Sequence, residues 1–122
     1  MKQLSILTLF IALFAFKASA QTAIAAKDAA KHIGENVTIC DKVYSTKLLD
    51  GANITFLDLG GNHPDQLLTL VIKGDDRAKF KGQPEVDYKG KDVCVTGVLV
   101  DYKGKPEIIV SDPAQLKLND NK

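Results

Sequence analysis

Hydrophobic residues occur in short segments along this chain, and polar turns separate the segments. Residues 93–100 and 107–110 are rich in β-branched side chains, and a polar turn that contains Gly104 joins them. This pattern is typical of a β-hairpin. Segments of similar character predict three strands upstream, at 37–47, 54–59 and 67–73. The pattern therefore predicts five strands.

Two helical segments are expected between and before these strands. The alanine-rich residues 23–32 predict a short helix ahead of the first strand. One helical turn is expected over residues 75–80, capped by Asp75 and ended before Pro84. Residues 41–42 interrupt the alternation of the first strand, which predicts a bulge or a strong bend there.

The two cysteines of the chain lie in two predicted strands that begin in a similar way. In each case a glycine, Gly34 or Gly90, and two polar residues precede a short strand that carries one cysteine, Cys40 or Cys94. If the valine and isoleucine positions of both strands face one core, both cysteines lie on the outer side. Adjacent antiparallel strands would then bring them within bonding distance. We therefore expect a Cys40–Cys94 disulfide. A redox-active pair is the less favoured alternative, because the chain has no Cys-x-x-Cys spacing.

The order of the elements predicts the fold. A helix, three strands, a helical crossing and two more strands indicate an all-β fold with minor α content. A five-stranded Greek-key barrel of the OB-fold type, with a short N-terminal helix, fits this order. Its first strand pairs with both the second and the fourth, which the disulfide also requires. A small β-sandwich is the alternative, but it needs about seven strands. We expect residues 21–122 to form this single domain.

Residues 1–20 have the pattern of an export signal. Lys2 precedes an apolar run over residues 4–16, and Ala18-Ser19-Ala20 has the small-x-small form of a cleavage site. An uncleaved membrane anchor is the alternative, but the run is short for a spanning helix. We expect cleavage after Ala20, no membrane insertion afterwards, and a periplasmic or secreted protein.

Five segments also carry a resemblance to a known family: A-A-K-H-I-G-E at 29–35, V-T-I-C at 37–40, T-F-L-D-L-G at 55–60, V-I-K-G-D-D-R at 71–77 and G-K-D-V-C-V-T-G at 90–97. Together they resemble exported bacterial OB-fold domains of the nucleic-acid-binding, tRNA-anticodon/helicase type, over about residues 25–113. The resemblance implies an OB-fold and a nucleic-acid ligand. It also implies a secreted hydrolase as a partner, because similar segments occur beside secreted nuclease or phosphoesterase domains. The motifs specify the fold better than the function.

The ligand face of an OB-fold lies on the outer side of its first three strands, between the loop after the first strand and the loop of the last hairpin. If the leucines of the second and third strands point inward, Asp58, Thr69 and Val71 point outward, with Lys105 in the last hairpin. Aromatic rings can stack on bases, and lysines can contact phosphates. The predicted ligand-binding residues are Lys42, Tyr44, Lys47, Phe56, Lys73, Tyr102 and Lys103.

The charge of the chain limits how such a face could bind a polyanion. The chain has 16 Lys and Arg and 15 Asp and Glu. Loss of Lys2 and Lys17 with the signal would leave one more acidic than basic residue. A nearly neutral domain gains little long-range attraction to nucleic acid, so any such site must be a local patch. Solvated turn lysines, and tyrosines that cover the barrel ends, are the alternative interpretation.

Catalytic patterns are weak in this sequence. Arg77 is the single arginine, and its neighbours Asp75 and Asp76 favour a helix cap with a local ion pair. His32 and His63 are far apart and have no partner at a metal-ligand spacing. No phosphate-binding loop or nucleophile elbow is present. We therefore expect no enzymatic activity, no cofactor and no metal site.

Two functions remain. The first is a secreted or periplasmic OB-fold binding module for single-stranded DNA or RNA, or for another oligomer, acting beside a secreted hydrolase. The second is an envelope or secreted interaction protein whose barrel binds a protein or a small ligand. An exposed apolar patch around Phe56 and Val71 would favour the second function.

Overall fold

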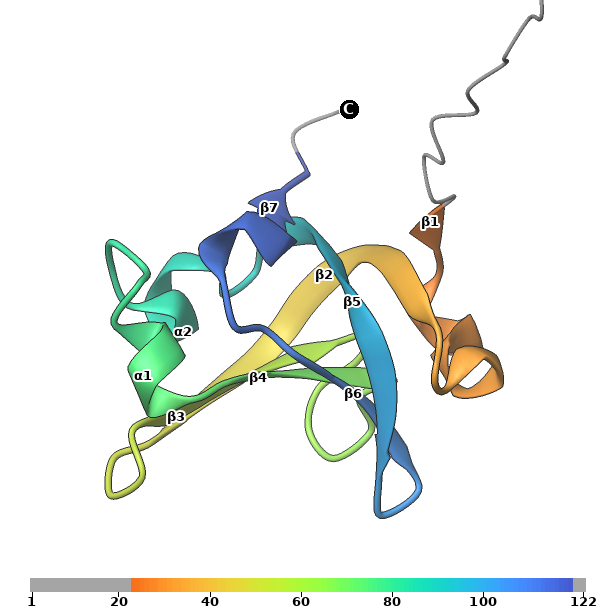
Figure 1. Ribbon diagram of the computed structural model, residues 1–122, viewed down its shortest axis with the longest axis horizontal. Coiled ribbons are helices and arrows are strands. Elements are labelled where there is room, and N and C mark those ends of the chain that lie inside the picture. The colour runs from red at the N-terminus through yellow and green to blue at the C-terminus, as the bar shows by residue number, and fades with distance from the viewer. Residues whose placement is uncertain (1–22, 120–122) are drawn as a thin grey trace, which may run out of the picture.

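Residues 23–119 are described in the computed structural model of the protein, and they form seven strands and four short helices (Figure 1). In chain order these are β1 (Ala23–Ile24), the 3₁₀ helix η1 (Ala26–His32), β2 (Asn36–Leu49), β3 (Ile54–Leu59), β4 (Leu68–Ile72), α1 (Gly74–Arg77), α2 (Pro84–Asp87), β5 (Asp92–Tyr102), β6 (Lys105–Ile109), the 3₁₀ helix η2 (Pro113–Gln115) and β7 (Leu116–Leu118). The signal predicted at residues 1–20 lies outside the described residues. Within them, no helix has the length and apolar character needed to cross a membrane.

Five of the strands close into a ring. β2 pairs with β3, β3 with β4, and β6 with β5 in antiparallel fashion, whereas β4 and β6 run parallel. β2 also pairs with β5, which completes the ring. This order is consistent with an OB-like β barrel. The predicted strands correspond to β2 through β6, and the predicted pairing of the first of them with both the second and the fourth is confirmed.

β2 belongs to both halves of the ring because it is long and bent (Figure 1). Its first half, residues 36–42, pairs with β5, and its second half pairs with β3. The register with β3 shifts between Val43 and Ser45, which leaves Tyr44 as the extra residue of a bulge. The bulge predicted at residues 41–42 is therefore present slightly further along the strand.

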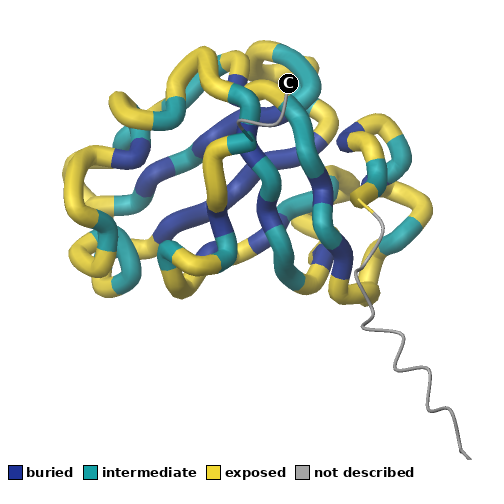
Figure 2. Tube along the Cα trace, turned by 90° about the horizontal axis from the view of Figure 1, so that it is seen from above, coloured by how far each residue is buried: buried dark blue, intermediate teal, exposed yellow. Residues whose placement is uncertain are grey.

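Aliphatic side chains from alternate positions of the strands fill the ring. Twelve of the larger ones are fully buried: Ile39, Val43, Leu57, Leu59, Leu68, Leu70, Ile72, Val93, Val95, Leu99, Ile108 and Val110. Figure 2 shows these buried stretches along the strands, with exposed residues mainly in the turns. Burial of one such side chain contributes about 1.5–3 kcal/mol, so a register slip that exposed several of them would be strongly disfavoured.

The N-terminal segment differs from the sequence prediction. The predicted helix over 23–32 begins only at Ala26 and has 3₁₀ geometry, while Ala23–Ile24 forms β1, which runs parallel to the start of β2. Ile24 packs against the core, and Ala26 and Ala29 are buried in it. Packing of Ile24 and pairing with an open strand edge outweigh the helix preference of the first alanines, because tertiary contacts override intrinsic propensity.

The disulfide prediction is confirmed. Cys40 and Cys94 lie directly opposite each other in the β2–β5 register and are bonded, with a Cα–Cα distance of 4.0 Å. The hydroxyl groups of the neighbouring pair, Thr38 and Thr96, are 2.8 Å apart. The apolar neighbours on both strands, such as Ile39, are buried, so the disulfide is on the outer side, as expected.

The helices α1 and α2 cover β3 and part of β2, and a polar cluster joins them to β3. We call Asn53, Thr55, Arg77 and Glu85 the Arg77 cluster. Arg77 Nε donates to Thr55 Oγ1 at 2.9 Å, its guanidinium pairs with the Glu85 carboxylate, and Nη1 donates to Asn53 Oδ1 at 3.2 Å. Thr55, which is fully buried, donates to Glu85 Oε1 at 2.9 Å.

This cluster corrects two sequence expectations. Asp75 does not cap the helix, because Lys73 is the N-cap residue and no side chain accepts a hydrogen bond there. Arg77 pairs with Glu85 rather than with its sequence neighbours. The reason is the start of α2 at Pro84, which places Glu85 opposite Arg77. Asp76 pairs instead with Lys79 at 3.1 Å.

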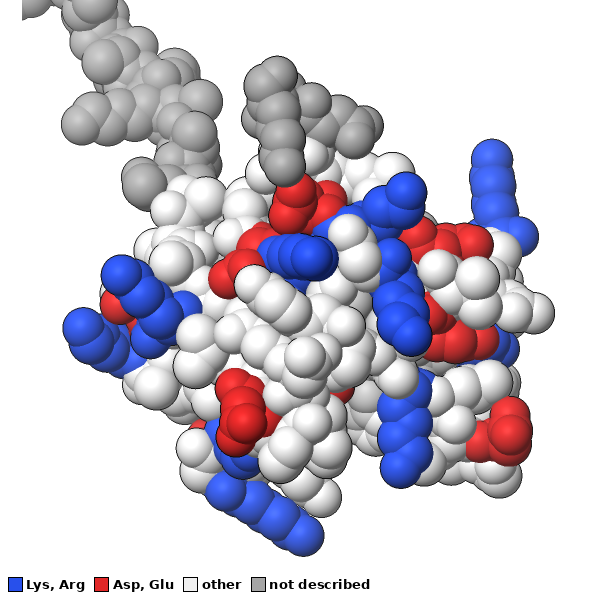
Figure 3. Space-filling view, turned by 180° about the vertical axis from the view of Figure 1, so that it is seen from behind, with Lys and Arg blue, Asp and Glu red and all other residues white. Residues whose placement is uncertain are grey.

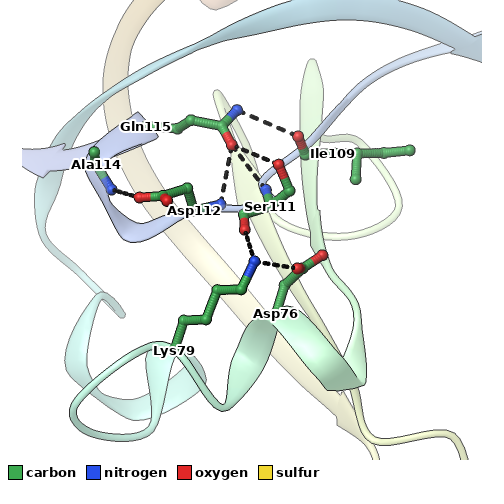
Figure 4. Close-up of polar contacts among 7 residues, drawn as sticks. All are labelled: Asp76, Lys79, Ile109, Ser111, Asp112, Ala114 and Gln115. Carbon is green, nitrogen blue, oxygen red and sulfur yellow. Dashed lines mark hydrogen bonds and ion pairs between the residues drawn. The ribbon is translucent and has the colours of Figure 1, made fainter.

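Gln115 holds the segment after β6 in place (Figure 4). Its Oε1 accepts hydrogen bonds from the backbone nitrogen atoms of Ser111 and Asp112 at 2.8 and 3.0 Å. Lys79 donates to the Ser111 carbonyl at 2.9 Å and pairs with Asp76, which links this segment to α1. The chain then adds β7 to β5, a strand that the sequence pattern did not predict.

Candidate ligand-binding cavity

A partly open cavity of about 600 Å³ lies on the outer face of the ring, between the β5–β6 hairpin, the β3–β4 loop and the second half of β2. Its lining residues are Ser45, Thr46, Lys47 and Leu49 of β2, Phe56 and Asp58 of β3, His63 and Gln66 of the β3–β4 loop, Thr69 of β4, and Tyr102, Lys103, Lys105 and Glu107 of the hairpin. This is the face on which OB-folds bind oligomers.

Strand register aligns four polar side chains in one row across the sheet. Ser45 pairs with Asp58, Asp58 with Thr69, and Thr69 with Glu107. Side chains at paired positions lie on the same side of a sheet, and the neighbouring leucines point into the core, so the row faces outward. We call Ser45, Asp58, Thr69 and Glu107 the floor row.

Asp58 is the centre of a hydrogen-bond network in this floor, where its exposed fraction is only 4%. Ser45 Oγ donates to Asp58 Oδ2 at 2.9 Å, and Thr69 Oγ1 donates to Asp58 Oδ1 at 3.1 Å. Gln66 Nε2 in turn donates to Thr69 Oγ1 at 3.1 Å, and the His63 backbone N–H donates to Ser45 Oγ at 3.0 Å. Both carboxylate oxygens of Asp58 are therefore occupied by partners within the protein.

Two acceptors on the cavity lining have no hydrogen-bond partner within residues 23–119. Gln66 Oε1 is buried without one. The direction of the network fixes this assignment, because the Thr69 hydroxyl gives its proton to Asp58 and can only accept from the Gln66 amide. The Glu107 carboxylate is the second, and burial raises its pKa above the ordinary value. The cavity thus offers unused acceptors to a ligand.

The lysines of the cavity belong to its two flanking segments. Lys47 comes from β2, and Lys103 and Lys105 come from the hairpin. Lys105 Nζ donates to the Pro64 carbonyl at 2.7 Å, and the Lys103 ammonium group lies 5.3 Å from the centre of the Tyr102 ring. Cations therefore flank a floor that carries carboxylates.

The hairpin turn explains why its residues reach the cavity together. Lys103 and Gly104 have φ values of 51° and 87°, the left-handed pair of a type I′ turn. This tight turn pairs Tyr102 with Lys105 across the two strands. Tyr102 is about half exposed, and Phe56 from β3 is partly buried, so the cavity has two rings available for stacking.

The structure brings four of the seven predicted ligand residues together: Lys47, Phe56, Tyr102 and Lys103 line the cavity. Lys42 and Tyr44 instead contact each other where β2 bends, with the ammonium group 5.3 Å from the ring centre. Lys73 follows the end of β4 and is exposed at the N-cap of α1. The bulge in β2 and the end of β4 explain why these three lie outside the cavity lining.

Three other lining residues, Glu107, Gln66 and His63, were not among the residues expected on the ligand face. Glu107 alternates with the buried Ile108, and that parity was a usable signal for an outward side chain. Gln66 and His63 lie in a loop without periodicity, so no sequence pattern indicates them. Within residues 23–119, no group of three or more His, Cys, Asp or Glu side chains is arranged to hold a metal ion.

Charged side chains of both signs are interspersed on the face shown in Figure 3. Basic and acidic groups lie next to each other around a centre of uncharged residues. This distribution agrees with the nearly balanced composition of the chain. Any attraction of an anionic ligand would therefore come from local cations such as those that flank the cavity.

Comparisons with known proteins support the fold. No protein-family model matches the chain, and no curated protein sequence matches it. A solved structure assigned as an aspartyl-tRNA synthetase from Leishmania major Friedlin is similar, with a TM-score of 0.52 and 12% identity over 87% of this chain. An asparaginyl-tRNA synthetase from Pyrococcus horikoshii has a TM-score of 0.52 and 14% identity over 78% of this chain. The match covers only 22% of either synthetase chain, and at such low identity it concerns the fold.

Proposed function

We propose that this domain is a non-catalytic binding module that holds a short stretch of single-stranded nucleic acid in the cavity. The observation that carries the proposal is the meeting of two aromatic rings and three lysines in one cavity on the outer face of the ring. Single-strand binding sites combine stacking platforms with cations that follow the phosphates. Phe56 and Tyr102 would supply the platforms, and Lys47, Lys103 and Lys105 would supply the cations.

The size and composition of the cavity suit such a ligand. A volume of about 600 Å³ is within the usual range for small-molecule sites, which favours a few nucleotides over a long tract. Stacking of one base on an aromatic ring contributes about 1–3 kcal/mol, and each lysine adds a salt-dependent phosphate contact. The resemblance of the sequence to nucleic-acid-binding OB-fold domains and the fold of two proteins named as tRNA synthetases also support this class of ligand.

We also propose that the domain acts outside the cytoplasm, in the periplasm or the medium. The export pattern of residues 1–20 and the Cys40–Cys94 disulfide support this location, because disulfides persist mainly in oxidising compartments. A secreted hydrolase remains a proposed partner on the strength of the sequence resemblance.

The alternative function is an envelope or secreted interaction protein whose barrel binds a protein or a small ligand, and an exposed apolar patch around Phe56 and Val71 would favour it. Such a patch is not present at these two residues. Val71 is only 7% exposed, and Phe56 lines the cavity beside polar residues.

Titration of the purified protein with fluorescently labelled, mixed-sequence DNA and RNA oligonucleotides tests the proposal. Binding should weaken with salt, with a slope of log K against log salt of about −2 for three phosphate contacts. Phe56→Ala should weaken binding about tenfold through lost stacking. Lys47→Ala should make the slope less negative by about 0.7.

Lys42→Ala and Lys73→Ala are matched controls, since each removes one exposed positive charge outside the cavity lining. They should change affinity less than about twofold, in keeping with screened surface charges. Absence of measurable binding at low salt would overturn the proposal, and so would an equal loss in Lys47→Ala and both controls.

A further inference from the structure

The next inference rests on the proposed function and concerns which bases the cavity accepts. We propose that the cavity prefers bases with an exocyclic amino group, namely cytosine, adenine and guanine, over uracil and thymine. Glu107 is the side chain that accepts a hydrogen bond from that amino group.

The hydrogen bonds within the floor row leave Glu107 as its one carboxylate that is free to accept a hydrogen bond from a base. Asp58 already accepts one hydrogen bond at each carboxylate oxygen, so it is committed to the protein. The protons of the Ser45 and Thr69 hydroxyl groups are used in those two bonds. Glu107 is the next member of the same row, paired with Thr69, and its carboxylate has no hydrogen bond or ion pair within residues 23–119.

A second orphan acceptor lies on the same lining. Gln66 Oε1 is buried and unpaired, because the amide nitrogen of that side chain faces Thr69. Buried polar atoms in native proteins nearly always have a partner, so this oxygen requires a donor from a water molecule or a ligand. The two unpaired acceptors, Gln66 Oε1 and the Glu107 carboxylate, therefore favour a ligand that donates hydrogen bonds.

Bases differ in the group that would face these acceptors. Cytosine has an amino group where uracil has a carbonyl oxygen, and carboxylates accept hydrogen bonds from the cytosine amino group. A uracil carbonyl placed against Glu107 would leave two acceptors facing each other without a proton, which disfavours uracil at this position. The available lysine ammonium groups come from the flanking segments, where the phosphates would occupy them. A preference of about tenfold for cytosine over uracil follows.

Binding of oligo(dC) and oligo(dU) of equal length by the purified protein tests the inference. The two ligands have the same backbone charge, so the ratio of their affinities reports base recognition alone. The protein should bind oligo(dC) about tenfold more tightly. Glu107→Gln should bring the ratio close to one, because a glutamine amide can donate to uracil as well as accept from cytosine.

Glu35→Gln is the matched control, an exposed carboxylate outside the cavity whose loss should leave the ratio unchanged. Equal binding of oligo(dC) and oligo(dU) by the unmodified protein would overturn the inference and leave the proposed function intact. A preference that persists in Glu107→Gln would overturn the role of Glu107. Absence of binding to either oligonucleotide would overturn both the inference and the proposed function.

Discussion

Two glutamates, Glu85 and Glu107, are each partly buried beside the same ring of strands, but their surroundings differ. Glu85 is 11% exposed in the Arg77 cluster, where burial alone would raise its pKa. Hydrogen bonds from Arg77 and Thr55 and the charge of Arg77 outweigh that effect, so the pKa of Glu85 is lowered. Glu107 has no such partner in the cavity, and burial raises its pKa. A partnered carboxylate stabilises the fold, whereas an unpartnered one costs stability and remains available to a ligand.

Arg77→Met should produce the largest effect, because it leaves the Glu85 carboxylate without its cationic partner and removes a hydrogen bond to the buried Thr55. Removing one member of a buried ion pair costs about 3–5 kcal/mol, and the slight exposure of this pair favours the lower end. Urea denaturation at neutral pH measures the loss. Lys31→Met, which removes an exposed pair with Asp28, should cost less than about 1 kcal/mol.

Acid should reduce the difference in stability between Arg77→Met and the unmodified protein. The pKa of Glu85 is lower in the folded protein than its ordinary value of 4.5, so the pair stabilises the fold above that pH. The contribution is lost as the pH falls through the lowered pKa. Arg77→Met and the unmodified protein should therefore converge in stability in strong acid. A loss no larger than that of Lys31→Met at neutral pH would show that the Arg77 cluster is not structural.

Thr69→Val should have an intermediate effect on stability. The change keeps the side-chain volume but removes the hydroxyl group that donates to Asp58 and accepts from Gln66. Two buried polar groups would lose a partner, at a cost of about 1–3 kcal/mol. Thr96→Val is the control, since it removes a hydroxyl group that is only partly buried. Thermal or urea denaturation of both variants should give the larger loss for Thr69→Val, and equal losses would contradict the network in the floor.

Glu107→Gln should have the smallest effect and the opposite sign. The pKa of Glu107 is raised in the folded protein, so its contribution is fully present below the ordinary value of 4.5 and is lost as the pH rises through the raised pKa. Because glutamine does not ionise, the variant keeps the stability that the unmodified protein loses when Glu107 becomes charged. The variant should be more stable than the unmodified protein at pH 7, by less than about 1 kcal/mol, and of similar stability near pH 3. Urea denaturation at both pH values measures this, and a less stable variant at pH 7 would mean that Glu107 has a stabilising partner.

Most of the ring could be predicted from the sequence. Alternation of apolar residues and the turn residues between them were sufficient for β2 through β6, and the matched positions of Cys40 and Cys94 were sufficient for the β2–β5 contact. The same alternation placed Phe56 and Asp58 on the outer side. The two edge strands, β1 and β7, were missed because each is only two or three residues long, too short for a period to be visible.

The candidate site was less predictable than the ring. Tyr102, Lys103 and Lys47 followed from the general position of the ligand face in an OB-fold, together with Phe56. Gln66 could not be found in this way, because its loop has no repeating pattern. Lys42 was expected on the outer face of the strands and Tyr44 in the loop after the first strand, whereas both lie where β2 bends.

Burial of apolar side chains depends on a local repeat along each strand, so the amino-acid sequence already indicates the core of this protein and its five ring strands. The two similar cysteine-bearing strands indicate the disulfide. Pairing of polar side chains depends on residues far apart in the chain, as between Thr55 and Glu85, which are 30 positions apart. No local pattern distinguishes Glu85 from Glu107, since both are acidic residues that follow a proline. The folded arrangement provides Arg77 for one and leaves the other unpaired at a cavity, and that difference separates a structural carboxylate from a candidate ligand contact.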